Sequence, residues 1–119
     1  MAMDVEAGPH TLRGDEPADQ GGTDTGPQPH ELLLAALGTC TLMTLRMYAG
    51  RKGWPLGGTR VRLTGAKAPD GGYAIGRHIH FDAALDAEQR TRLIEIADKC
   101  PVHKTLKGQI AIATSDESA

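Results

Sequence analysis

The stretch GPQPHELLLAALGTCTLMTLRMYAGRKG, from Gly26 to Gly53, decides the fold of this chain. Its run from Leu32 to Leu45 carries no charged side chain. Two prolines precede the run, where a missing N–H costs a helix nothing, and Glu31 stands where the positive end of the helix dipole favours a carboxylate. Basic residues and a glycine close the stretch, as is typical of a helix end. Because apolar residues occur on all sides, we predict a long helix that is buried on every side.

The bulk composition indicates one soluble domain over residues 1–119. A net charge of −2 and a pI near 6.2 give no reason to expect nucleic acid or an anionic membrane as a partner. The uncharged run is shorter than a membrane span, and the first residues lack the basic and apolar regions of a signal peptide. We therefore expect a cytoplasmic protein that does not enter a membrane.

Alternating apolar and polar residues around the turn Pro69–Gly72 predict a β-hairpin, with Ile75 and Ile79 on one face of its second strand and His78 and His80 on the other. Leu93, Ile94, Ile96 and Ala97 form an apolar stripe on a later helix. The elements expected besides the central helix are strands at Met3–Ala7, His10–Arg13, Thr59–Lys67, Tyr73–Asp82 and Gln109–Thr114, and helices at Ala87–Lys99 and Pro101–Lys107.

This order of elements predicts an α+β domain, with helices gathered on one face of an antiparallel sheet of about five short strands. Such a sheet covers one side of the central helix, and the second helix covers part of another. The remaining apolar side needs a partner, because exposed apolar patches of that size are uncommon on monomers. A second copy of the chain across a two-fold axis is the simplest cover, so we expect a homodimer.

The chain has two cysteines, Cys40 in the middle of the long helix and Cys100 just before Pro101. Cys40 is either a small core residue or a reactive thiol, and the second role requires a cation from elsewhere, since burial raises the pKa of a thiol. Cys100 either simply ends a helix or caps the next one, where free N–H groups favour a thiolate. The candidate cations for Cys40 are His10, Arg13, Arg77 and His103.

Other chemistries have weaker sequence support. Cys100-x-x-His103 together with His78-x-His80 supplies plausible zinc ligands, but the usual paired C-x-x-C spacing is missing and such histidines are commonly just solvated. The only serines lie in the C-terminal tail, outside any G-x-S-x-G motif, and no glycine motif for phosphate opens a helix. We expect neither a metal nor a cofactor.

Several motifs together resemble one family. They are Asp15-Glu16-Pro17, the run Gly21 to Pro27 (GGTDTGP), the run Glu31 to Thr41 (ELLLAALGTCT) and Cys100-Pro101-Val102-His103. The pattern, which extends over about residues 10–114, resembles the OsmC-like family of osmotically inducible and organic-hydroperoxide-resistance proteins. The resemblance implies an intertwined homodimer with two long helices at its centre.

The resemblance also implies a reaction. In the peroxidase members the helix cysteine attacks an organic hydroperoxide and becomes a sulfenic acid, and a second cysteine then condenses with it to a disulfide that a dithiol reductant reopens. Carried over, Cys40 is the peroxidatic residue and Cys100 the resolving one. The alternative is a redox-sensing or small-molecule-binding dimer with little peroxidase turnover, and a third reading is a structural or metal-binding module.

Peroxidase members hold the thiolate with an arginine paired to a glutamate that lies ten residues before the cysteine. His30 occupies that position here, and Glu31 is one residue later, which turns its side chain by about 100° around the helix. The resemblance makes Glu31 the possible orienting carboxylate and Arg13 the nearest match for the thiolate's cationic partner.

Overall fold

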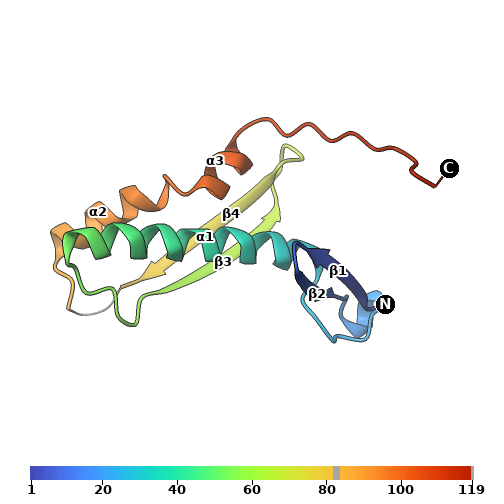
Figure 1. Cartoon of the computed structure of the whole chain (residues 1–119), viewed down its shortest axis with the longest axis horizontal. Helices are drawn as coiled ribbons and strands as arrows, with labels where there is room; N and C mark the ends of the chain where they lie inside the picture. Colours follow the sequence, from blue (N-terminus) through green and yellow to red (C-terminus); the bar gives the residue numbers. More distant parts are fainter. Residues whose placement is uncertain (82–83, 119) are drawn as a thin grey trace.

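The computed structural model describes residues 1–81 and 84–118, and Figure 1 shows the arrangement of its elements. A long helix, α1, runs through the molecule, with one β-hairpin against it and a second hairpin beyond its N-terminal end. The elements in chain order are β1 (Met3–Ala7), β2 (His10–Gly14), a short 3-10 helix η1 (Ala18–Gln20), α1 (Pro29–Lys52), β3 (Arg60–Lys67), β4 (Tyr73–His80), α2 (Ala87–Ala97) and α3 (Pro101–Lys107).

Helix α1 begins and ends where its local sequence predicts. The Gln28 side chain accepts a hydrogen bond from the His30 backbone N–H at 2.8 Å, while Glu31 accepts one from the Gln28 N–H at 2.9 Å. This reciprocal cap satisfies two N–H groups that the first turn leaves without helical partners. At the other end Gly53 adopts a left-handed conformation with φ of 70°, which glycine tolerates best.

Hairpin β3–β4 lies along α1 (Figure 1). Its strands pair antiparallel, with Val61 opposite Ile79 and Leu63 opposite Arg77. Gly38 of α1 allows a close approach, because a Cβ there would lie only 2.7 Å from Cδ1 of Leu63. The face with these residues therefore lies toward the helix, and the alternate residues lie on the outer face, as the sequence predicts for the histidines of β4.

The apolar core lies at the C-terminal half of α1, where α2 packs against it. Helix α2 starts with a second reciprocal cap between Asp86 and Gln89. The expected stripe of α2 is partly wrong, because Ile94 is 49 % exposed while its other members are buried. The core consists of Leu45, Ala49, Leu56, Leu85, Leu93, Ile96 and Ala97, with Tyr48, Trp54, Ile79 and Phe81 against it.

The prediction of a single sheet of about five strands is wrong within a single chain. The described residues form two separate two-stranded hairpins, β1–β2 and β3–β4. Residues 109–114, expected as the last strand, are extended but pair with no strand of the described chain. Because a strand requires a hydrogen-bonded neighbour, they do not form one. Figure 1 shows this tail leaving the body after α3. The expected strand from Tyr73 stops at His80, and Asp82 lies outside the described residues.

The loop that leads into α1 is organised around one buried carboxylate. Asp15 is 3 % exposed and accepts hydrogen bonds from the backbone N–H and the hydroxyl of both Thr23 and Thr25, and from the N–H of Glu16. Its hydroxyl donors, Thr23 before Thr25, hold the pKa of Asp15 well below its ordinary value. A residue with a side chain could not replace Gly22, because its Cβ would collide with the Glu16 carbonyl. This network holds the segment that precedes the helix in one conformation.

Within one chain, α1 is not buried on every side as predicted. Its buried residues form one stripe, whereas Met43 and Met47 on the opposite face are 63 % and 67 % exposed. By length and composition alone the helix could cross a membrane, but core helices of soluble proteins share that property. Further apolar side chains are exposed at Met3, Val5 and Leu12 of β1–β2 and at Ile110 and Ile112 of the tail.

The chain also exposes more surface than a compact monomer of its mass. Its accessible area is 8686 Å², whereas a folded monomer of 12.6 kDa has about 6,200 Å². Its radius of gyration is 17.4 Å, against about 13.5 Å for a compact domain of this length. The excess area, roughly 2,500 Å², is larger than the ~800 Å² that each partner buries in a standard interface.

Candidate active site

The fold brings the two cysteines into contact although they lie far apart in the sequence. Cys40 lies in the middle of α1 and is half-buried, and Cys100 precedes α3 and is fully buried. Both are free thiols, and their side chains lie close enough for each to shift the pKa of the other. Helix α3 packs against α1, which is how two residues on different helices meet.

Cys100 is held at the N-terminus of α3 as the sequence suggests. Pro101 occupies the first helical position, and the Cys100 Sγ accepts a hydrogen bond from the His103 backbone N–H at 3.3 Å. A cysteine thus takes the capping role that serine, aspartate or asparagine usually fills. Its sulfur is fixed in direction toward α1 by the helix that it caps.

The two thiols differ in acidity, and Cys40 is the more acidic. Burial opposes ionisation of Cys40, but the backbone N–H of Val102 and the thiol of Cys100 outweigh it and bring the pKa of Cys40 below its ordinary value. The Thr44 hydroxyl and the charge of Arg77 act in the same direction. For Cys100, burial and the hydrogen bond to Cys40 raise the pKa. The pair therefore favours a Cys40 thiolate that accepts a hydrogen bond from a neutral Cys100.

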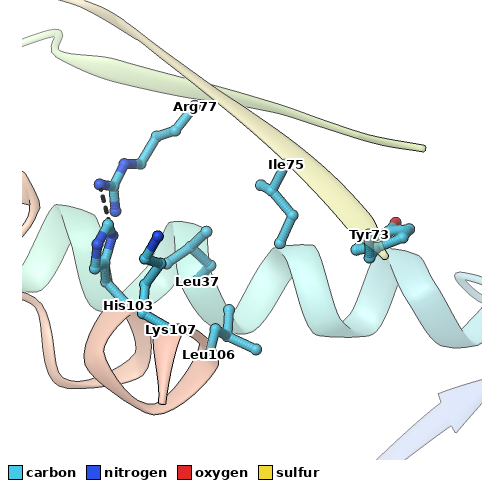
Figure 2. A pocket seen from close by; sticks show the side chains of 7 residues that line it. All are labelled: Leu37, Tyr73, Ile75, Arg77, His103, Leu106 and Lys107. Atoms are coloured by element: carbon cyan, nitrogen blue, oxygen red, sulfur yellow. Dashed lines mark hydrogen bonds between the residues drawn. The ribbon is translucent and has the colours of Figure 1, made fainter. Parts of the chain in front are cut away.

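Arg77 of β4 supplies the positive charge that lowers the pKa of Cys40, and its position is fixed by three contacts. Nη1 donates to the Thr41 hydroxyl at 3.1 Å, and Nη2 donates to Oδ1 of Asp98 at 2.7 Å. Nη2 also lies 3.0 Å from Nδ1 of His103 (Figure 2). Because a guanidinium can only donate, this Nδ1 accepts, so the imidazole carries its proton on Nε2 in this arrangement.

A pocket of about 290 Å³ opens between α1, β4 and α3, and neither cysteine is among the residues that line it. Figure 2 shows its lining side chains, which come from α1, β4 and α3. Arg77 and His103 belong both to this pocket and to the surroundings of the cysteines. The remaining lining residues are Leu37, Tyr73, Ile75, Leu106 and Lys107.

The two activating residues suggested by the resemblance lie elsewhere in this chain. The Arg13 side chain, in β2, binds Oδ1 of Asp4 at 3.2 Å, and Glu31 caps α1. Neither is among the groups that change the pKa of Cys40, and both the Arg13 contact and the Glu31 cap are exposed. A single chain thus does not join them to the thiol.

Arg77 is one of the four candidate cations for Cys40 that the sequence offers, and the sequence alone does not distinguish among them. The signal that selects it is the alternation of β4, because Arg77 shares the inward face with Ile75 and Ile79. An arginine on an apolar strand face requires a partner inside, and here it has Thr41. The roles of Thr41, Asp98 and the Val102 N–H depend on how α3 packs, which the sequence did not indicate.

Of the four side chains considered as zinc ligands, His78 and His80 do not join Cys100 and His103. His78 and His80 are exposed on the outer face of β4, opposite the face that meets α1. Across residues 1–81 and 84–118, no group of three or more His, Cys, Asp or Glu side chains is arranged to hold a metal ion.

Comparison with known proteins places the chain in a family. The family model described as "OsmC-like protein" matches residues 22–115. The chain belongs to the OsmC-like family. This agrees with the motifs quoted from its sequence. No curated protein sequence matches the chain.

Solved structures of other OsmC-like proteins share the fold at low sequence identity. An OsmC-like protein from Mycoplasma pneumoniae has a TM-score of 0.76 and 23 % identity, with 90 % of this chain and 79 % of that one covered. An osmotic stress-induced and detoxification response protein from Psychrobacter arcticus gives 0.71 and 22 %, covering 87 % and 85 %. The organic hydroperoxide resistance protein OhrB of Bacillus subtilis gives 0.61 and 22 %, covering 91 % and 90 %. These likenesses establish the α+β OsmC-like fold.

Proposed function

We propose that this OsmC-like chain is a cytoplasmic, thiol-dependent peroxidase that reduces organic hydroperoxides. The observation that carries the proposal is the contact between a more acidic Cys40 and a buried, neutral Cys100. Family membership supports the reaction class, since solved OsmC-like relatives include proteins named for organic hydroperoxide resistance.

In the first step the Cys40 thiolate attacks the outer oxygen of the hydroperoxide. An S–O bond forms and the O–O bond breaks, so that Cys40 becomes a sulfenic acid and the peroxide leaves as an alcohol after gaining a proton. The guanidinium of Arg77 favours the ionised thiol, and its contacts with Asp98 and His103 hold it in place. The apolar side chains of the adjoining pocket favour an organic substrate over hydrogen peroxide.

In the second step the Cys100 sulfur attacks the sulfenic acid. The S–S bond forms, the S–O bond breaks, and water leaves with the proton of the Cys100 thiol. The two side chains already interact and α3 packs against α1, so this step needs little rearrangement of the two helices. An external dithiol then reduces the disulfide by thiol–disulfide exchange and is itself oxidised.

Thiol titration tests the reaction directly. One equivalent of cumene hydroperoxide is expected to remove both thiols of each chain, and a dithiol is expected to restore them. The reagent 5,5′-dithiobis(2-nitrobenzoate) counts the thiols, and hydrogen peroxide at the same concentration serves as the comparison. If both thiols survive the organic hydroperoxide, the chain is not a peroxidase of this kind.

We also propose that the working unit is a homodimer formed over the uncovered face of α1. Cys40, Met43 and Met47 follow one another at helical spacing, so a partner there would also border the thiol site. The excess accessible area of the single chain is large enough for such an interface.

Charge on this face is expected to break the dimer. The double substitution Met43→Glu and Met47→Glu should shift the sedimentation coefficient from dimer to monomer, because each carboxylate would be desolvated in the interface. Ile94→Glu, on an exposed apolar side chain of α2, is the control and should leave the dimer intact. A wild-type chain that sediments as a monomer at micromolar concentration would exclude the dimer.

A second function has some support from the structure. Arg13 and Glu31 do not surround the thiol within one chain, and the adjoining pocket is large enough for a small molecule. These features suit a redox-sensing or small-molecule-binding dimer with little turnover. Titration distinguishes it, because such a protein would be oxidised only slowly or would not cycle with a dithiol.

A further inference from the structure

The pocket beside the cysteines has two unlike ends. In Figure 2 the side chains of Arg77, His103 and Lys107 gather at one end, and Tyr73 lies at the other, with Ile75 between them. Leu37 and Leu106 add apolar surface. No acidic residue lines the pocket, so three nitrogen-bearing side chains face an otherwise apolar space. Pockets of this kind fix a ligand by a few polar groups and bind the rest of it by apolar contact.

The basic side chains at this end of the pocket are not equally available to a ligand. Arg77 is committed to Thr41, Asp98 and His103, and Asp98 is the one carboxylate that contacts this group in the described chain. Lys107 forms no ion pair with any other residue that the structure describes. It lies in the last turn of α3, so its flexible stem carries an uncompensated ammonium at the pocket.

We infer that the pocket binds an apolar molecule with a single anionic head group, and that Lys107 holds the head. The tail of such a molecule would lie along Leu106 and Ile75 toward Tyr73, where it loses contact with water. The head would lie at the end formed by Arg77 and His103, the two lining residues that also interact with the cysteines. This inference concerns the ligand of the same site, but it does not require that the chain turn over peroxide.

A bound carboxylate head would also restrict access to Cys40. Arg77 and His103 line the pocket, and each also interacts with one of the cysteines, so a ligand held there is expected to obstruct access to Cys40 from this side. An apolar monocarboxylate is therefore expected to slow the reaction of Cys40 with a neutral alkylating agent. An uncharged molecule with the same tail should do so far less.

Binding of octanoate and of 1-octanol, measured by isothermal titration calorimetry on the reduced protein, tests the inference. Octanoate is expected to bind about two- to fivefold more tightly than 1-octanol, which is the size of effect that one partly exposed ion pair supplies. Lys107→Met should remove this preference, and Lys107→Arg should retain most of it because the charge remains. Lys104→Met, on the same helix but outside the pocket lining, is the matched control and should bind octanoate like the wild type.

Protection of Cys40 supplies a second readout. The rate of Cys40 alkylation by iodoacetamide, followed by mass spectrometry, should fall with octanoate in wild type and Lys104→Met but not in Lys107→Met. Equal binding of octanoate and 1-octanol, no octanoate binding, or the same loss in Lys104→Met as in Lys107→Met would overturn the inference. Each result is independent of the hydroperoxide titration, so failure here leaves the proposed peroxidase standing, and the reverse also holds.

Discussion

Replacing Cys40 with serine is expected to abolish hydroperoxide consumption, with a loss on the order of 10³-fold or more. A hydroxyl at this position does not ionise near neutral pH, and the contacts that lower the pKa of the thiol cannot make it a comparable nucleophile. The measurement is the loss of cumene hydroperoxide in the ferrous–xylenol orange assay with excess dithiothreitol. A fully active Cys40→Ser variant would show that the attacking group is elsewhere.

Replacing Cys100 with serine should give a different defect. The first turnover should proceed, because Cys40 keeps the Val102 N–H, the Thr44 hydroxyl and the charge of Arg77. Without a resolving thiol the sulfenic acid remains exposed to further peroxide and advances to the irreversible sulfinic acid. Intact-mass spectrometry should show one added oxygen and then two, while steady turnover stops after one equivalent.

The contrast between these two variants carries the assignment of roles. If Cys100→Ser consumes hydroperoxide repeatedly with a dithiol, Cys100 does not resolve the sulfenic acid and the external thiol reduces it directly. If Cys100→Ser fails even in the first turnover while Cys40→Ser retains it, the two roles are exchanged. The raised pKa of Cys100 argues against that exchange, because a buried neutral thiol is a poor first nucleophile.

Local sequence rules predicted the helices and the hairpins β1–β2 and β3–β4 well, because the sequence signals for these elements are short-range. Helix α3 has the predicted bounds, Pro101–Lys107, and β1 has the predicted Met3–Ala7. The cap at Gln28 and the glycine at Gly53 define α1 within a few residues of the expected stretch. Each of these depends on hydrogen bonds between residues that are close in the sequence.

What the sequence could not supply depends on contacts between distant elements. The capping position of Cys100 suggested a thiolate there, yet the packing of α3 on α1 buries this sulfur and raises its pKa. The same packing turns Cys40 into the more acidic thiol. The segment 109–114 shows the converse case, because its alternating pattern is that of a strand while no strand in the described chain lies beside it.

The proximity of Cys40 and Cys100 has a consequence for the stability of the fold. The two positions are 60 residues apart, so a bond between them would close a loop that contains β3, β4 and α2. Closing a loop of this length restricts the unfolded ensemble by about 4 kcal/mol in the chain-entropy model. Oxidation would thus link α1 covalently to the start of α3 and raise the free energy of unfolding until a reductant breaks the disulfide.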